Sequence, residues 1–330
     1  MKKYYYIFTL GILVLLNTAC NKEWESEQYE HYVSFKAPIQ TEVGVTPIYI
    51  PYEPEGSFTY ELPLIVSGST SHTEDLGVNV AIDPDTLQVL NYARFQDRED
   101  LYYKELSSQF FSIQKDEIKI PAKEDVVLMD IDFTLREIDL VDKWVLPLTI
   151  VDDASYNYTP HPRKYYKKAL LRIIPFNDFS GVYSGTGLKI YLKGEEDGAA
   201  IVKNEVIAYV VDEHSMFFYA GMVDENDVNR KKYKINASFD ETTNEVELTA
   251  DDPGIEFKMN SDPTFTVEEV SDAVRPYLVR RYVTINDIDY SYTDYTSMPG
   301  STISYTVKGS LIMERKINTQ IPDKDQAIEW

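Results

Sequence analysis

Cysteine is almost absent from this sequence, and its scarcity excludes several kinds of site. The 330 residues contain a single cysteine, Cys20, so the chain cannot form an internal disulfide or a cysteine-rich metal centre. No Gly-x-Ser-x-Gly motif occurs, which removes the usual signature of a serine hydrolase. The four histidines, His31, His72, His161 and His214, lack the spacing of metal ligands. We therefore predict no catalytic residue, no metal and no cofactor.

Positive charge is the second scarcity. The chain has 32 Lys and Arg residues against 55 Asp and Glu residues, which gives a formal net charge of −23. A surface of this sign repels nucleic acid phosphates, so we expect no nucleic acid partner. Solubility on a crowded cell surface is a sufficient explanation for the acidity.

The acidic residues form no recognisable site. The run Asp224-Glu225-Asn226-Asp227 brings oxygen ligands close together, as a calcium loop does. It lacks the glycine and the distal glutamate of an EF-hand, and an exposed turn explains it equally well. Glycoside hydrolysis requires two carboxylates across a cleft, and with so many acids the sequence singles out no pair.

Long apolar runs are absent beyond a short one that begins near Ile7 and ends at Cys20. Lys2 and Lys3 precede this run, and small residues precede the cysteine, which is the pattern of a secretory signal peptide. The run is too short to span a bilayer. Residues 1–19 are therefore predicted to be a signal peptide and residues 20–30 a polar tether.

The position of Cys20 resembles that of the lipidated cysteine in bacterial lipoproteins. The resemblance implies that Cys20 becomes the new N-terminus and holds the protein to outer-membrane lipid. Lys22-Glu23 and Glu25 resemble the signal that sends Bacteroidetes lipoproteins to the cell exterior. An ordinary secretory signal with a chance cysteine and an N-terminal anchor helix are the alternatives.

Residues 31–174 show short segments of alternating polarity between turn residues, which predicts β-strands. Tyr60, Leu62, Leu64 and Val66 lie on one face of such a segment. About seven strands in this stretch are the number expected of an immunoglobulin-like β-sandwich. Pro175 to Gly181 combines turn formers with aromatic residues and is the predicted domain boundary.

Two motifs in this half resemble the N-terminal immunoglobulin-like domain of Bacteroidetes surface lipoproteins. One is the turn Ile120-Pro121-Ala122 followed by the alternating Val127, Met129, Ile131 and Asp132. The other is the strand Trp144-Val145-Leu146-Pro147-Leu148-Thr149-Ile150. The resemblance covers residues 30–172 and implies a fold of unknown function in a polysaccharide-utilisation (Sus-like) system, beside transport and glycan-binding proteins.

Residues 175–315 again predict antiparallel strands joined by polar turns, as in an up-and-down barrel or a sandwich. Phe179, Gly181, Tyr183 and Gly185 at the start, with the segment Tyr305 to Arg315 at the end, resemble the lipocalin-like C-terminal domain of related lipoproteins. The predicted fold is thus all-β, a sandwich followed by a lipocalin-like β-barrel. Residues 316–330 are predicted to be a loose tail.

Tyrosine is abundant, with 26 residues, and suggests a place for ligand binding. Flat rings with a polar tip bind the apolar faces of sugars, although they also pack cores. Tyr290 and Tyr292 are two residues apart and therefore share one strand face. With Tyr295 in the following loop and Phe218 in a second aromatic group, they are the predicted ligand-binding residues, and Tyr290, Tyr292 and Tyr295 are expected to form an aromatic platform on the surface.

The function we expect is non-catalytic: a lipid-anchored protein of the cell surface that binds a polysaccharide or oligosaccharide or assists its capture. Neighbouring outer-membrane transport or glycan-binding proteins are expected partners. The alternatives are an adhesin or scaffold that binds protein partners, and a glycoside hydrolase whose site leaves no sequence signature. An exposed aromatic platform would favour glycan, and a flat apolar patch would favour protein.

Overall fold

The computed structural model describes residues 29–37, 44–114 and 117–330. The predicted signal peptide and the lipidated Cys20 lie outside the described residues, so both stay predictions. No helix in the described part of the chain is long and apolar enough to cross a membrane.

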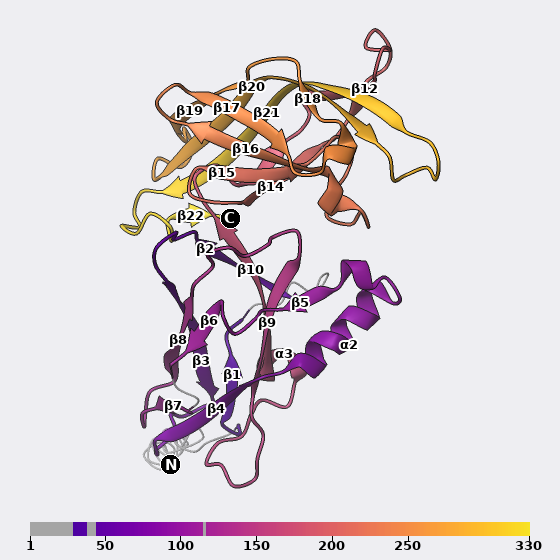
Figure 1. Ribbon diagram of the computed structural model, residues 1–330. Helices are drawn as coiled ribbons and strands as arrows, with labels where there is room; N and C mark the ends of the chain where they lie inside the picture. Colours follow the sequence, from indigo (N-terminus) through magenta and orange to yellow (C-terminus); the bar gives the residue numbers. More distant parts are fainter. Residues whose placement is uncertain (1–28, 38–43, 115–116) are drawn as a thin grey trace, which may run out of the picture.

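The N-terminal half is a sandwich of two sheets (Figure 1). The smaller sheet has the order β1-β3-β8-β6, formed by Tyr32–Phe35, Phe58–Ser67, Val126–Phe133 and Phe111–Ile113. The larger sheet has the order β2-β10-β9-β4-β7, with β5 beside β9. Its strands are Thr46–Pro51, Lys168–Phe176, Lys143–Ile150, Leu76–Ile82, Glu117–Ile120 and Tyr103–Glu105.

The core of this sandwich is formed by the apolar residues that alternate with polar ones along the strands. Leu62 and Leu64 on β3 are fully buried, as are Leu146, Leu148 and Ile150 on β9. Strand β2 runs parallel to β10, whereas the other pairs among these sheets, except β5 with β9, are antiparallel. The edge of the larger sheet that contains β2 and β10 lies toward the C-terminal half.

Helices are few and lie outside the sheets. Helix α2, Pro84–Phe95, begins where the side chain of Asp83 accepts a hydrogen bond from the backbone N–H of Thr86. Its Leu87 is buried against the larger sheet, beside Val145 and Leu170. The remaining helical turns are η2, Glu99–Leu101, and α3, Lys164–Lys167, in this half and η3, Arg230–Tyr233, and η4, Pro253–Ile255, in the other.

The C-terminal half is a closed antiparallel barrel of 8 strands, which confirms the predicted all-β fold with a barrel. Around the barrel run β11, β14, β15, β16, β17, β19, β20 and β21. Their residues are Gly181–Ser184, Glu205–Val210, Ser215–Tyr219, Lys234–Asp240, Glu245–Ala250, Thr264–Ser271, Leu278–Asp294 and Ile303–Asn318. Pairing of β11 with β21 closes the ring. The accessory strands are β12, Leu188–Leu192, β13, Ile201–Val202, β18, Lys258–Met259, and β22, Ile328–Glu329.

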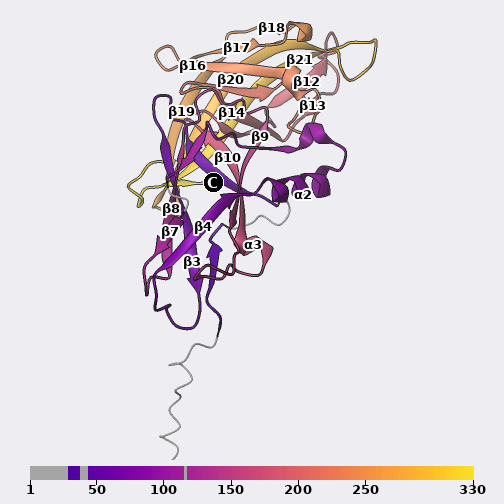
Figure 2. The ribbon, with the colours of Figure 1, turned by 60° about the horizontal axis from the view of Figure 1, so that its bottom comes forward.

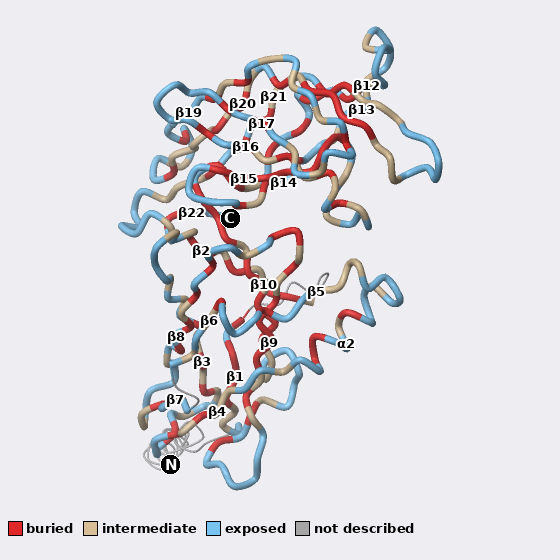
Figure 3. The backbone as a smooth tube through the Cα atoms, in the orientation of Figure 1, coloured by how far each residue is buried: buried red, intermediate tan, exposed pale blue. Residues whose placement is uncertain are grey.

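Aromatic side chains occupy the barrel interior. Phe179 stacks on Phe239 with ring centroids 4.1 Å apart, and the edge of Phe265 meets both rings. Tyr183 and Tyr290 are fully buried in the same core. Burial follows the strands of the barrel and the sandwich, and the loops are exposed (Figure 3).

One glycine in the barrel has a steric reason to be there. The pairing of β20 with β21 shifts register between Ile285 and Ile288, and Gly309 lies opposite this bulge with φ of +134°. A Cβ at this position would lie 2.0 Å from the carbonyl oxygen of Gly187. Only glycine accommodates both the backbone angle and the close approach.

The two halves share an apolar seam. Leu140 and Val141, in the connection before β9, pack against Val210, Phe217 and Tyr219 of the barrel. The view in Figure 2 shows the barrel seated on the end of the sandwich where β9 and β10 approach it.

The end of the chain also lies at this junction, which corrects the prediction of a loose tail over residues 316–330. Strand β21 extends to Asn318, and β22 pairs with it through Lys316 and Ile317. Trp330 then stacks on Tyr49 of β2 with ring centroids 4.0 Å apart. The segment is polar in composition, but Ile328 is paired and Trp330 is stacked. The C-terminus itself lies between the two halves (Figure 1).

Candidate functional site

The predicted aromatic platform does not lie on the surface. Tyr290, Tyr292 and Phe218 are exposed by 0%, 3% and 1%, and they belong to the barrel core. Tyr290 and Tyr292 do share one face of β20, but that face points into the barrel. Tyr295 is half-buried, and its hydroxyl donates to Asp252 Oδ2 over 2.9 Å. The prediction of an exposed platform is therefore wrong.

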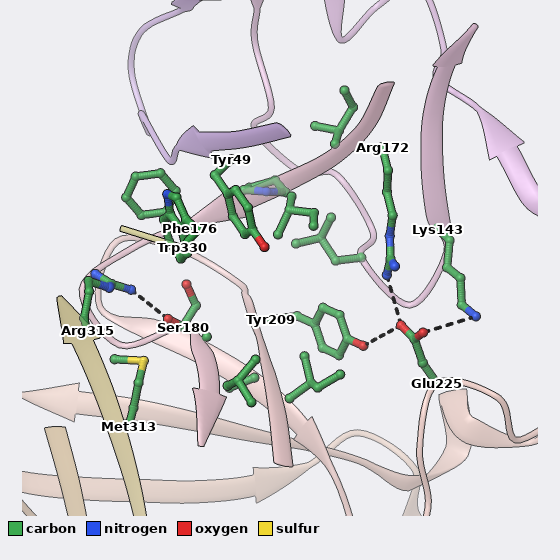
Figure 4. A pocket seen from close by; sticks show the side chains of 18 of the residues that line it. Tyr49, Lys143, Arg172, Phe176, Ser180, Tyr209, Glu225, Met313, Arg315 and Trp330 are labelled. Atoms are coloured by element: carbon green, nitrogen blue, oxygen red, sulfur yellow. Dashed lines mark hydrogen bonds and ion pairs between the residues drawn. The ribbon is translucent and has the colours of Figure 1, made fainter. Parts of the chain in front are cut away.

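A cavity of about 370 Å³ lies instead between the two halves (Figure 4). This volume falls within the roughly 300–1,000 Å³ of small-molecule sites. Strand β10 of the sandwich forms one wall, and β11 and β14 of the barrel form the other. Two groups of polar and aromatic side chains stand at its two ends.

The barrel wall of the cavity is apolar and uncovered. Val182 on β11 and Ile207 on β14 are partners in the strand register, so their side chains lie side by side. Val182 is 52% exposed and Ile207 is 41% exposed, although both line the cavity. Apolar side chains left open to water inside a cleft favour the binding of a ligand with an apolar face.

The first end of the cavity is a polar cluster centred on Glu225. Arg172 on β10 donates through Nη2 to Glu225 Oε2 over 3.0 Å, and Lys143 Nζ on β9 lies 3.5 Å from Oε1. The hydroxyl of Tyr209 on β14 donates to the same Oε2 over 3.1 Å. The carboxylate belongs to a barrel loop and both cations belong to the sandwich, so the cluster joins the two halves.

Burial and charge both shift the titration of this cluster. Burial raises the pKa of the Glu225 carboxyl, but Arg172 and Lys143 outweigh it, and the pKa lies below its ordinary value. Burial lowers the pKa of Lys143, and the charges of Arg172 and Arg230 lower it further against the attraction of Glu225. Glu225 is thus held as a carboxylate, which is the opposite of what a general acid requires.

The second end is an aromatic cluster around Trp330. Its ring stacks on Tyr49, meets the edge of Phe176 at 4.7 Å, and lies 5.4 Å from the guanidinium carbon of Arg315. Arg315 Nη2 donates to the carbonyl oxygens of Asn177 and Ser180. Burial lowers the pKa of Arg315 to about 10.

The acidic run that resembled a calcium loop has a different role in the structure. Asp224 and Asp227 close their own turn, because Asp224 Oδ1 accepts from Asn226 N and Asp227 Oδ2 accepts from Asp224 N. Glu225 projects out of that turn to Arg172. Within the described ranges, no group of three or more His, Cys, Asp or Glu side chains is placed to hold a metal ion.

The sequence alone does not predict this site. Arg172 stands as a charge within the apolar run Leu170-Leu171-Arg172-Ile173-Ile174, and that interruption was the available local signal. Nothing local connects it with Glu225 or with Trp330, because these residues meet only when the halves pack together.

Each half of the chain matches a known family model. The family described as domain of unknown function DUF4973 matches residues 24–154, and a second family model, described as a C-terminal domain, matches residues 167–312. No curated protein matches the sequence.

Solved structures from Bacteroides match nearly the whole chain. A Bacteroides ovatus protein of unknown function is 46% identical, with a TM-score of 0.82, over 91% of this chain and 100% of its own. A multidomain protein including DUF1735, also from Bacteroides ovatus, is 44% identical, with a TM-score of 0.81, over 91% and 100%. An auxiliary nutrient binding protein from Bacteroides thetaiotaomicron is 43% identical, with a TM-score of 0.81, over 92% and 100%.

Proposed function

The chain contains a DUF4973 domain at residues 24–154 and belongs with Bacteroides proteins that are 43–46% identical to it over nearly its whole length, and we propose that it is a non-catalytic, lipid-anchored surface protein that binds a nutrient glycan. We place the glycan in the cavity between the sandwich and the barrel. The observation that carries the proposal is the cavity itself, which combines uncovered apolar walls with a buried polar cluster. The Bacteroides thetaiotaomicron relative, described as an auxiliary nutrient binding protein, supports a binding role.

The cavity has the chemistry that a sugar ring requires. Sugars offer apolar C–H faces and a rim of hydroxyl groups. Val182, Ile207 and the ring of Tyr209 provide apolar contact on one side. Arg172 and Glu225, at the polar end of the cavity, provide donors and acceptors for hydroxyl groups.

The barrel interior is a poorer candidate for the site. Its described lining is a packed core that includes Phe218, Tyr290 and Tyr292. A ligand could enter only by displacing buried rings, which costs the free energy of their packing. The cavity between the halves requires no such displacement.

The location that we propose rests on the N-terminal segment. The predicted signal peptide, residues 1–19, ends just before Cys20, whose lipid would hold the protein in the outer membrane facing the exterior. Neighbouring transport or glycan-binding proteins of a polysaccharide-utilisation system would then be its partners. Metabolic labelling with a palmitate analogue tests the anchor, because a Cys20→Ser variant should lose the label.

A glycan panel tests the proposed function. The mature chain, from residue 20 on with Cys20 replaced by serine, is applied to immobilised polysaccharides and to short oligosaccharides in solution. Ile207→Trp fills the cavity from a position that is already 41% exposed and should abolish binding. Val267→Trp is the matched control, because Val267 has the same exposure on β19, away from the cavity, and should leave binding intact.

The results separate the function from the site. Loss of binding in Ile207→Trp alone supports both. Equal binding by both variants would keep the glycan and refute the cavity. Failure to bind any glycan would refute the proposal and favour a scaffold that binds protein partners.

A further inference from the structure

The polar end of the cavity has an excess of positive charge. Arg172 and Lys143 share one carboxylate, that of Glu225, and their side chains keep only 22% and 6% of their exposure. Asp142, which also lines the cavity, is already paired with Lys104 over 2.6 Å. In a chain with a formal net charge of −23, a partly buried site with two cations and one anion is a local exception.

A third cation adds to this excess. Arg230 is buried behind the cluster and donates to three carbonyl oxygens, those of Val141, Asp227 and Asp100. In the part of the chain that the structure describes, no carboxylate lies within ion-pair distance of it. Burial is the main cause of the lowered pKa of Lys143, and the charge of Arg230 lowers it further.

Arg172 is free to bind a further anion. In the described ranges, its only hydrogen-bond partner is Glu225, through Nη2. Arg172 lines the cavity, and its Nε and Nη1 have no hydrogen-bond partner among those residues. These two N–H groups point to opposite sides of the guanidinium, so each can donate to one oxygen of a carboxylate or sulfate group.

We propose that the cavity selects an acidic sugar, whose carboxylate or sulfate ester binds Arg172 and Lys143 while its ring lies against Val182, Ile207 and Tyr209. This inference rests on the proposed function and names the class of its ligand. Burying an uncompensated charge costs free energy, and an anionic ligand would remove that cost on binding. A neutral sugar would not.

The competing explanation is that the cluster only ties the two halves together. Two substitutions separate the explanations because both break the same bridge. Arg172→Met removes the proposed anion site, whereas Glu225→Gln removes the carboxylate that competes with the ligand for Arg172 and Lys143. A purely structural bridge predicts that both variants change ligand affinity in the same direction.

The test measures binding by calorimetry with three matched probes: a short galacturonic acid oligomer, the same oligomer with its carboxyl groups reduced to neutral galactose, and a sulfated galactose oligomer. We expect one acidic probe to bind at least about tenfold more tightly than the neutral one. Arg172→Met should abolish this difference and Glu225→Gln should increase it. Added salt should weaken only the acidic probe.

The acidic probe that binds better identifies the group as carboxylate or sulfate. Equal affinity for the neutral and acidic probes would overturn the inference and leave the proposed function intact. A shift of the same sign in both variants would also overturn it. If Arg172→Met does not fold, Lys143→Met replaces it with the same expectation. Binding of no probe, together with no binding in the wider glycan panel, would refute both proposals.

Discussion

Glu225 should contribute measurably to the stability of the whole molecule, because its carboxylate is the shared counter-ion of Arg172 and Lys143. In Glu225→Gln the amide keeps an acceptor for the hydroxyl of Tyr209 but removes the negative charge. Hydrogen bonds to charged groups contribute roughly 1.5–3 kcal/mol when buried, and leaving a buried cation unpaired adds to the loss. Glu225 retains 23% of its side-chain exposure. We therefore expect a loss of about 2 kcal/mol in the free energy of unfolding.

Urea denaturation followed by circular dichroism measures this loss directly. In a chain of this size the expected change corresponds to a fall of ~3 °C in the melting temperature. Glu195→Gln is the matched control, because Glu195 lies exposed in the turn between β12 and β13. Its stability should equal that of the wild type within about 0.5 kcal/mol.

A double-mutant cycle attributes the effect to the ion pair. Arg172→Met alone and together with Glu225→Gln should show a coupling energy of at least about 1 kcal/mol. The stability contributed by Glu225 is present above its unfolded pKa and lost as the pH falls through its lower folded pKa. The difference between wild type and Glu225→Gln should therefore shrink below the ordinary value of 4.5. A coupling energy near zero, with no dependence on pH, would show that Glu225 and Arg172 do not stabilise each other.

Three further predictions concern the barrel and the end of the chain. Gly309→Ala should lower stability by about 2 kcal/mol or more in urea titrations, because its Cβ would collide with backbone; wild-type stability would contradict the assigned strain. Burial raises the pKa of Asp294, but hydrogen bonds to its carboxylate outweigh burial and hold the pKa at about 2. The wild type should therefore be more stable than Asp294→Asn near neutral pH and lose that extra stability between about pH 4 and pH 2. A constant difference over that range, in melting temperatures, would count against this. Trp330→Ala should cost about 1 kcal/mol through the lost stack on Tyr49, and Trp330→Phe should restore most of it.

The alternation of apolar and polar residues predicted many of the strands, because successive side chains of a strand point to opposite faces of its sheet. Tyr60, Leu62, Leu64 and Val66 were placed on one face of a strand, and Leu62 and Leu64 are fully buried in the sandwich. The same reasoning placed Tyr290 and Tyr292 on one face of a strand. It could not say that the face points inward, because an aromatic residue suits both the interior of a barrel and its surface.

The candidate site could not be predicted because it depends on contacts between distant parts of the chain. The sequence shows Glu225 within an acidic run and Arg172 within an apolar strand. Each pattern has a local explanation, as a turn and as a strand interrupted by a charge. Only the packing of the barrel on the sandwich brings the two side chains to 3.0 Å and opens the cavity beside them.

The closure of the barrel by β11 and β21 also fixes the order in which the chain can become stable. β11 is the first strand of the barrel, and its partner β21 is the last, so the aromatic interior stays open to water until the end of the chain arrives. Contacts between such distant segments form slowly, and exposed rings in the meantime favour aggregation. The pairing of β21 is thus the step that closes the barrel around its aromatic core.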